Sequence, residues 1–276
     1  NASVMRIFPL LLALITGSVL SAAAAETPWQ EIAPGVSVRL ISSGKIDADG
    51  KTLFGLEIDM PENTKTYWRV PGETGFPTEL DFSKSRGVSD GRIVWPHPIV
   101  DLSSGYLDFA YFGPTLLPIE VSVADKSGEV ELSALLGICS DICIPAQADF
   151  ELPVSDATPD RPNGLRIRQA LSEAPIPWTD GKAPIGKVEF LKDENTLAVS
   201  LETEDIDPGS IIVATDSGEP LFGMPQKSPQ ANLVLLPILA KTENIDLTGQ
   251  DVQLSFMTGM GAFELRRTVG AEPANE

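Results

Sequence analysis

The chain has few of the side chains that most often carry out chemistry. Its 276 residues include two cysteines, Cys139 and Cys143, and one histidine, so any general base or metal ligand of the histidine type has to be His97. Basic residues are also scarce, with 20 Lys and Arg against 39 Asp and Glu and a formal net charge of −19. Because proteins bind nucleic acids through clustered cations that replace counterions on phosphates, this balance argues against a nucleic-acid partner.

Long apolar runs are missing beyond the N-terminus. Met5 and Arg6 precede an apolar run over residues 7–20, which small residues follow up to position 25. One positive charge, a short apolar core and a small-residue cleavage site are typical of a secretory signal peptide. The alternative, a membrane anchor, needs about 20 apolar residues. We therefore expect residues 1–25 to be a signal peptide and the mature chain to be exported.

Turn-forming residues are plentiful, with 23 Gly and 23 Pro, which favours a β-rich chain over a helical bundle. Period-2 alternation and β-branched residues predict strands at residues 36–41, 53–58, 93–95, 117–123, 188–191, 196–201, 210–214, 233–239, 252–256 and 263–269. The proline-rich stretch between the two halves has helical character only at residues 164–173, with Asn163 as the expected cap.

These patterns predict an all-β protein of two β-sandwich domains joined by a short helix-containing linker. The expected boundaries are a signal peptide at 1–25, a first sandwich at 26–155, a linker at 156–184, a second sandwich at 185–270 and a tail at 271–276.

The two cysteines lie between two segments with apolar residues at alternate positions. Even positions from Val130 to Ile138, and from Ile144 to Leu152, are apolar, which predicts two strands that each bury one face. Cys139 and Cys143 fall on the opposite face and are expected to point away from the core. Residues four apart in one strand are about 13 Å apart, too far for a disulfide. A disulfide therefore requires the chain to reverse at residues 140–142.

The residues alone leave three interpretations of this pair open: redox exchange, a structural clip, and metal binding. A bridge that closes about five residues contributes roughly 2 kcal/mol in the chain-entropy model, which makes it a weak clip. A close pair at a turn, on the face away from the core, favours exchange with a partner thiolate. Met224, Met257 and Met260 could add soft ligands for Cu(I), but methionine more often fills a core.

Three motifs in order resemble one family. Residues 136–145, LGICSDICIP, resemble the cysteine segment of the N-terminal periplasmic domain of the thiol:disulfide interchange protein DsbD, and their spacing is that of the ScsB-like form. Residues 66–77, TYWRVPGETGFP, and residues 94–98, VWPHP, resemble two further stretches of that family. The resemblance extends from about residue 36 to residue 152.

The resemblance implies an immunoglobulin-like sandwich in the periplasm with a reversible Cys139–Cys143 disulfide, and weakly favours Cys143 as the sulfur attacked first. It implies a thiol-disulfide oxidoreductase that takes electrons from a membrane donor of the CcdA or DsbD type. The acceptors would be periplasmic thioredoxin-like or disulfide-bonded proteins, with a link to copper tolerance. We expect no cofactor and no bound metal ion.

Six further residues are candidates for the surroundings of the pair. Relatives shield their cysteines with a short cap loop, for which residues 97–106, including His97, Ile99 and Tyr106, are the candidate. Tyr67 and Trp68 could form a platform beside the sulfurs, although packing inside the sandwich is the simpler interpretation, and a lone loop histidine is usually solvated.

Asp141 lies between the cysteines, and no Lys, Arg or His is closer to them in sequence than Lys126. A carboxylate there disfavours the thiolate, which predicts a reductant-type couple. The alternative function is a non-catalytic periplasmic binding or assembly module whose disulfide is only structural.

Overall fold

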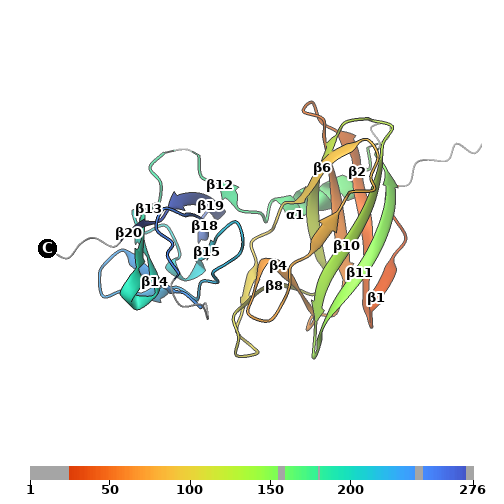
Figure 1. Ribbon diagram of the computed structural model, residues 1–276. Helices are drawn as coiled ribbons and strands as arrows, with labels where there is room; N and C mark the ends of the chain where they lie inside the picture. Colours follow the sequence, from red (N-terminus) through yellow and green to blue (C-terminus); the bar gives the residue numbers. More distant parts are fainter. Residues whose placement is uncertain (1–24, 155–158, 180, 240–244, 272–276) are drawn as a thin grey trace, which may run out of the picture.

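The computed structural model describes residues 25–154, 159–179, 181–239 and 245–271, and the regular secondary structure of these residues is almost entirely β-strand (Figure 1). The all-β prediction is confirmed. The expected signal peptide lies outside the described residues except for its last position. No helix in the described part of the chain is long and apolar enough to cross a membrane.

Two sheets from the first half pack face to face, and we call residues 25–154 the N-terminal sandwich. One sheet has the order β1 (Gln30–Ala33), β2 (Val36–Ile46), β3 (Lys51–Asp59), β9 (Thr115–Val123) and β6 (Val88–Ile93). The other has the order β11 (Cys143–Pro153), β10 (Glu129–Cys139), β4 (Lys65–Gly72), β8 (Asp108–Phe112) and β7 (Ile99–Asp101), and β5 (Glu79–Asp81) also pairs with β10.

Apolar side chains at alternate positions of the strands form the core between these two sheets. Leu132 and Leu136 of β10 are fully buried against residues of the facing sheet such as Leu40, Phe54 and Leu117. Burial of such side chains contributes about 1.5–3 kcal/mol each. The strand expected at residues 93–95 ends at Ile93, the last residue of β6 that is paired in register with β9.

The second half forms two more sheets, which we call the C-terminal sheets. One has the order β12 (Ile176–Pro177), β19 (Gly261–Thr268), β18 (Asp251–Thr258) and β15 (Ile212–Ala214), and the other has the order β16 (Gln226–Lys227), β17 (Leu233–Pro237), β14 (Thr196–Leu201), β13 (Ile185–Leu191) and β20 (Gly270–Ala271). They enclose their own apolar cluster, which includes Phe190, Val199 and Phe256.

Two local predictions in this half need correction. The strand expected from residue 210 begins at Ile212, because residues 208–210 form the 3₁₀ turn η2 (Pro208–Ser210); a second such turn is η1 (Lys192–Glu194). Ala271, the first residue of the expected tail, belongs to β20 and pairs with Phe190. Residues 272–276 lie outside the described residues.

The helix α1 (Arg161–Leu171) starts earlier than expected. Asp160 is its N-cap and accepts a hydrogen bond from the backbone N–H of Asn163 at 2.9 Å, so the prediction of Asn163 as the cap is wrong. Pro162 explains the start, since proline favours the first turn of a helix. The helix buries Ile167 and Ala170 and contacts β2, β3 and β9, so it covers the outer face of the first sheet.

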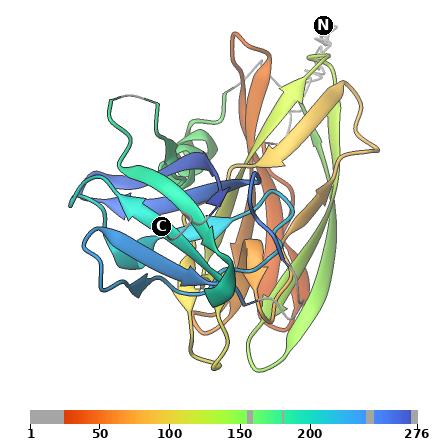
Figure 2. The same ribbon diagram turned by 60° about the vertical axis from the view of Figure 1, so that its left-hand side comes forward.

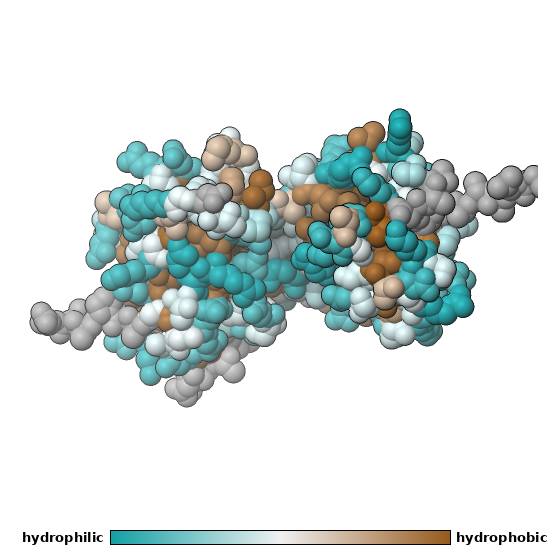
Figure 3. All heavy atoms as spheres, turned by 90° about the horizontal axis from the view of Figure 1, so that it is seen from above, coloured by the Kyte–Doolittle hydropathy of each residue, from teal (hydrophilic) through white to brown (hydrophobic). Residues whose placement is uncertain are grey.

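The C-terminal sheets lie beside β4 and β8 of the N-terminal sandwich (Figures 1 and 2). Arg69 of β4 stacks on Trp68 at 4.5 Å and donates a hydrogen bond to Oε1 of Gln253 in β18 at 2.8 Å. Ile212 and Ala214 of β15 join the core cluster of the N-terminal sandwich. Seen from above, both bodies have a mainly polar surface interrupted by apolar patches (Figure 3).

Candidate functional site

The cysteines close the hairpin formed by β10 and β11. The two strands pair in register at every position from Glu129 opposite Pro153 to Cys139 opposite Cys143. Residues 140–142 form the turn, and the two sulfurs are joined in a disulfide with their Cα atoms 4.0 Å apart. The predicted chain reversal and the bridge across it are confirmed.

The two cysteines differ in their exposure to solvent. Cys143 is exposed, whereas Cys139 is only 7% exposed. Cys139 lies outside the main core, as its position in the alternation predicts, but it packs with Tyr67 and Ala110, beside Phe112, on β4 and β8. The prediction that both sulfurs face outward is therefore wrong for Cys139, because neighbouring strands of its own sheet cover it.

Tyr67 is the side chain that the structure brings to the disulfide. Its ring is fully buried and its hydroxyl oxygen lies 3.4 Å from Sγ of Cys143. Two glycines make room for the ring: a Cβ at Gly75 would overlap it, and a Cβ at Gly137 would lie 3.0 Å from it. Burial raises the pKa of Tyr67, so the hydroxyl keeps its proton and can donate a hydrogen bond to sulfur.

Three buried charges beside the pair were missed by the sequence analysis. Lys65 of β4 lies directly opposite Cys139 in the sheet. Its ammonium is 2.7 Å from Oδ2 of Asp101 and 2.7 Å from Oδ2 of Asp108. Lys65 and Tyr67 share one face of β4, and an aspartate stands at each end of the 102–107 loop; these were the only sequence signals for the cluster.

Lys65 and Asp101 are held in their charged forms. Burial would raise the pKa of Asp101, but hydrogen bonds from Lys65 and Ser103 outweigh it and lower the pKa to about 2. Burial acts in the opposite direction on Lys65 and by itself would lower its pKa. The hydrogen bonds to Asp101 and Asp108 outweigh this effect, so the pKa of Lys65 is raised. The expectation that no basic residue is near the cysteines, drawn from the sequence distance to Lys126, is wrong, because sheet pairing brings Lys65 to Cys139.

The other candidate residues lie in different surroundings. Trp68 points into the main core and contacts Phe109 edge-on, with ring centroids 5.8 Å apart. Ile99 is exposed on β7, Tyr106 is exposed in the turn that follows it, and Asp141 is exposed in the cysteine turn. Of the six candidates, Tyr67 has a direct contact with a cysteine sulfur and Asp141 is adjacent in sequence.

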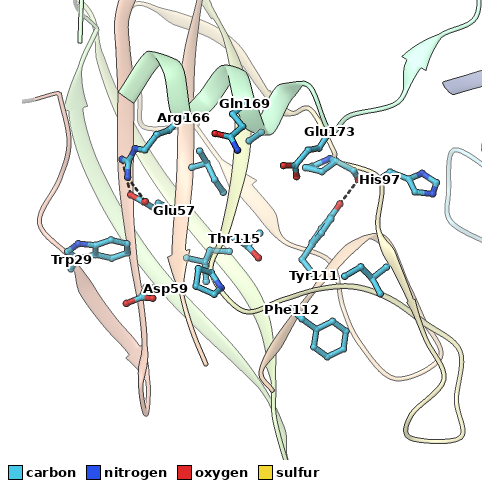
Figure 4. A pocket seen from close by; sticks show the side chains of 16 residues that line it. Trp29, Glu57, Asp59, His97, Tyr111, Phe112, Thr115, Arg166, Gln169 and Glu173 are labelled. Carbon is cyan, nitrogen blue, oxygen red and sulfur yellow. Dashed lines mark hydrogen bonds and ion pairs between the residues drawn. The ribbon is translucent and has the colours of Figure 1, made fainter. Parts of the chain in front are cut away.

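His97 lies in a cavity of about 500 Å³ beneath α1 (Figure 4). Neither cysteine lines this cavity. The backbone N–H of His97 donates to the carbonyl of Glu173 at 2.9 Å, and burial lowers the pKa of its side chain. The interpretation of His97 as a solvated loop residue is therefore wrong. Figure 4 also shows the ion pair of Arg166 with Glu57, two other residues that line this cavity, on the side away from His97.

Metal ligands do not converge on either place. Within the described ranges, no group of three or more His, Cys, Asp or Glu side chains is arranged to hold a metal ion.

The geometry of the hairpin agrees with a family match. Residues 37–155 match the family described as the N-terminal part of the thiol:disulfide interchange protein DsbD. This part of the chain, which we call the DsbD-like segment, is similar to that family. The disulfide at the tip of the hairpin lies within the matched residues and supports a thiol-disulfide exchange module.

Solved structures support the fold of this module. The N-terminal periplasmic domain of ScsB from Proteus mirabilis is 22% identical, with a TM-score of 0.72 over 89% of this chain and 98% of that chain. The expected immunoglobulin-like sandwich is thereby confirmed for the DsbD-like segment. A marsupial T cell receptor is 9% identical over 86% of this chain and 98% of its own, and its TM-score of 0.20 is too low to indicate a shared fold. A search among curated proteins found no match.

Proposed function

We propose that the protein relays electrons through a reversible Cys139–Cys143 disulfide, from a membrane donor to periplasmic acceptor proteins. The observation that carries the proposal is the unequal burial of the two cysteines at the tip of one hairpin. An incoming thiolate attacks a disulfide sulfur in line with the bond that breaks. Only Cys143 offers such an approach from solvent, so it is the sulfur attacked first.

The reductive half-reaction then follows. A thiolate of the donor attacks Sγ of Cys143, a mixed disulfide forms, and Cys139 leaves as a thiolate that takes up a proton. The second donor cysteine attacks the donor-side sulfur of the mixed disulfide and releases Cys143 as a thiolate, near the hydroxyl of Tyr67. The donor ends as a disulfide, and this protein has gained two electrons and one proton, which is carried by Cys139.

The oxidative half-reaction reverses these roles. The Cys143 thiolate attacks a disulfide of the acceptor and forms a second mixed disulfide, with one acceptor sulfur leaving as a thiolate. Cys139, held opposite Cys143 by the strand pairing, then loses its proton and attacks Cys143. The acceptor leaves as a dithiol and the original disulfide is restored.

The charges near the pair favour a reducing couple. Lys65 with Asp101 and Asp108 forms a cluster of formal charge −1, and Asp141 adds an exposed carboxylate in the turn. Negative charge disfavours a thiolate, and a couple whose thiolate is not stabilised is a weak oxidant. The pair therefore suits a protein-disulfide reductase, with a potential well below that of DsbA.

The partners and the domain plan complete the proposal. We assign the donor to the CcdA or DsbD type and the acceptors to periplasmic thioredoxin-like or disulfide-bonded proteins, with a role in copper tolerance. Two apolar clusters, the first of which also takes in Ile212 and Ala214 of β15, support a redox domain at residues 26–155 and a second sandwich at 185–270, joined by residues 156–184. Residues 1–25 would direct the chain to the periplasm.

A redox titration tests the proposal. The purified chain is equilibrated with glutathione buffers and then with thioredoxin buffers of graded ratio, and free thiols are counted after acid quenching. We expect a reversible transition of the Cys139–Cys143 pair in the native state. A disulfide that resists reduction until the protein unfolds would contradict the relay and support the structural module instead.

The order of attack has its own test. In Cys139→Ala the remaining Cys143 should react with a maleimide at least about tenfold faster than Cys139 does in Cys143→Ala, because thiol reactivity follows exposure. Equal rates, or a faster Cys139, would overturn the assignment of Cys143.

A further inference from the structure

The buried ions beside the cysteines point to a control on access to the disulfide. We propose that Lys65 is a positioning residue that clamps the 102–107 loop and the segment at residues 73–76 over Tyr67, and thereby slows the attack of thiols on the Cys139–Cys143 bond. The proposal rests on the proposed function, because it concerns the reactivity of the same disulfide.

The ammonium of Lys65 connects both ends of the 102–107 loop. Asp101 is the last residue of β7 before the loop, and Asp108 is the first residue of β8 after it. Both carboxylates accept from Nζ of Lys65 at 2.7 Å. Asp101 also accepts from the backbone N–H of Ser103 at 2.9 Å, which fixes the first turn of the loop. The ammonium of Lys65 thus bridges the two carboxylates at the base of the loop, where Asp101 and Asp108 are also paired in the β7–β8 ladder.

Asp108 extends the clamp to the segment at residues 73–76. Its Oδ1 accepts from the backbone N–H of Thr74 at 3.0 Å, and its Oδ2 accepts from the Thr74 hydroxyl at 2.5 Å. The backbone N–H of Glu73 donates to the carbonyl of Leu107 at 2.8 Å. The segment and the loop are therefore held to each other as well as to Lys65.

The same segment covers the side chain that contacts the disulfide. Gly75 lies so close to the Tyr67 ring that a Cβ would overlap it, and the carbonyl of Phe76 lies against Gly137 of β10. Tyr67 in turn reaches Sγ of Cys143. A continuous series of contacts therefore leads from Lys65 to the exposed sulfur, while Lys65 itself pairs with the buried one.

Stability alone does not account for this cluster. Replacing a buried ion pair with neutral or apolar groups of similar size is often neutral or stabilising, because the charges lose their hydration. Removing only the ammonium would instead leave two buried carboxylates without their cation. The informative variant therefore neutralises all three groups together.

The test uses the full chain with its disulfide formed. Lys65→Met/Asp101→Asn/Asp108→Asn is compared with the unaltered protein in two measurements: amide hydrogen exchange at residues 73–76 and 102–107, and the rate of disulfide reduction by the phosphine TCEP. We expect both rates to rise about tenfold, the factor that the loss of one hydrogen bond to a charged group typically produces.

Two further variants make the result specific. Lys51→Met/Glu120→Gln removes the 2.8 Å ion pair between β3 and β9 on the other sheet, and it should leave both rates unchanged. Lys65→Arg keeps the cation and both carboxylates, so the disulfide in this variant should be reduced as slowly as in the unaltered protein. If the triple variant does not fold, Asp101→Asn alone releases one end of the loop and should raise both rates about threefold, as the loss of a weaker hydrogen bond would.

The outcomes separate this inference from the proposed function. Faster exchange together with faster reduction supports the clamp, whereas an unchanged reduction rate overturns it, whatever the exchange shows. A native disulfide that resists TCEP in the unaltered protein contradicts the relay. In that case the clamp is supported if the triple variant becomes reducible, and overturned if it does not.

Discussion

Two hairpins of this molecule have the same plan and only one is cross-linked. The β10–β11 hairpin pairs from Glu129 to Cys139 and turns through residues 140–142. The β18–β19 hairpin pairs in register from Asp251 opposite Thr268 to Thr258 opposite Gly261 and turns through residues 259–260. Each carries one exposed apolar side chain at its tip, Ile142 at 74% and Met260 at 78% exposure.

The comparison shows that a hairpin of this kind does not need a disulfide to hold its two strands together. The β18–β19 hairpin keeps a complete strand pairing with no cysteine, so backbone pairing and burial of one face are enough to hold such a hairpin. A bridge at the end of an already complete pairing adds little to its stability. Its position at the tip, with one exposed cysteine, fits the proposed thiol-disulfide exchange, which needs a cysteine that a partner can reach.

The largest effect is expected from removing the bridge. Cys139→Ser/Cys143→Ser should abolish thiol-disulfide exchange, because both sulfurs are needed to form and resolve a mixed disulfide. The free energy of unfolding should fall by only about 2 kcal/mol, the value for a loop of this length. Insulin reduction measures the exchange activity, and urea unfolding measures the free energy of unfolding. A protein that no longer folds would show that the hairpins differ in stability and not only in chemistry.

The next comparison places one methyl group in each hairpin. Gly137→Ala puts a Cβ 2.7 Å from the carbonyl of Phe76 and 3.0 Å from the Tyr67 ring. Such overpacking should cost about 1–3 kcal/mol of unfolding free energy. Gly259→Ala meets nothing within 4 Å and should change it by less than about 0.5 kcal/mol. Equal effects in urea unfolding would mean that Tyr67 is not tightly enclosed.

Acid should affect the surroundings of the cysteine hairpin through Asp101. Its pKa of about 2 in the folded protein lies below the value of about 3.9 for an unfolded chain. The stability it contributes is therefore complete above about pH 4 and is lost as the pH falls toward 2, on the order of 1–2 kcal/mol. Asp101→Asn should flatten the dependence of the urea midpoint on pH in this window. An unchanged slope would remove Asp101 from the acid response.

The smallest effects on stability are expected at the two tips. Ile142→Ser and Met260→Ser should each change the free energy of unfolding by less than about 0.5 kcal/mol, because both side chains are exposed. Reduction by thioredoxin should slow severalfold in Ile142→Ser, since the side chain adjoins the attacked sulfur, while reduction by TCEP stays constant. Met260→Ser should leave both rates unchanged. A loss of the thioredoxin rate in both variants would point to a contact shared by the two tips.

The sequence contained what was needed to find the hairpin but not the surroundings of the sulfurs. Alternation at even positions from Val130 to Leu152 is a local pattern, and it placed the turn and both cysteines correctly. The burial of Cys139 comes from Tyr67 and Ala110, which reach it only through the order of strands in the sheet. That order is set by long-range pairing, which local periodicity does not encode.

The same limit explains the missed ions and the misplaced helix cap. Lys65 lies between two threonines, so nothing in its neighbours marks it as buried; its partners Asp101 and Asp108 are fixed by the pairing of β4, β7 and β8. For α1, two residues suited to capping stand near each other, and Asp160 takes the position because Pro162 sets the first turn. To predict Asp160 as the N-cap, the preference of Pro162 for the first turn had to count for more than the capping ability of the Asn163 side chain.

The pairing that ends at the cysteines also has a kinetic consequence. After reduction, ten residue pairs from Glu129 to Ile138 still hold the two strands together, so the two thiols do not diffuse apart. When one cysteine forms a mixed disulfide with a partner, the other cysteine therefore attacks it in an intramolecular step. The effective concentration of this second thiol is far above that of any free thiol in solution. Covalent capture of a partner is then brief, and a complex stable enough to isolate requires the loss of one cysteine.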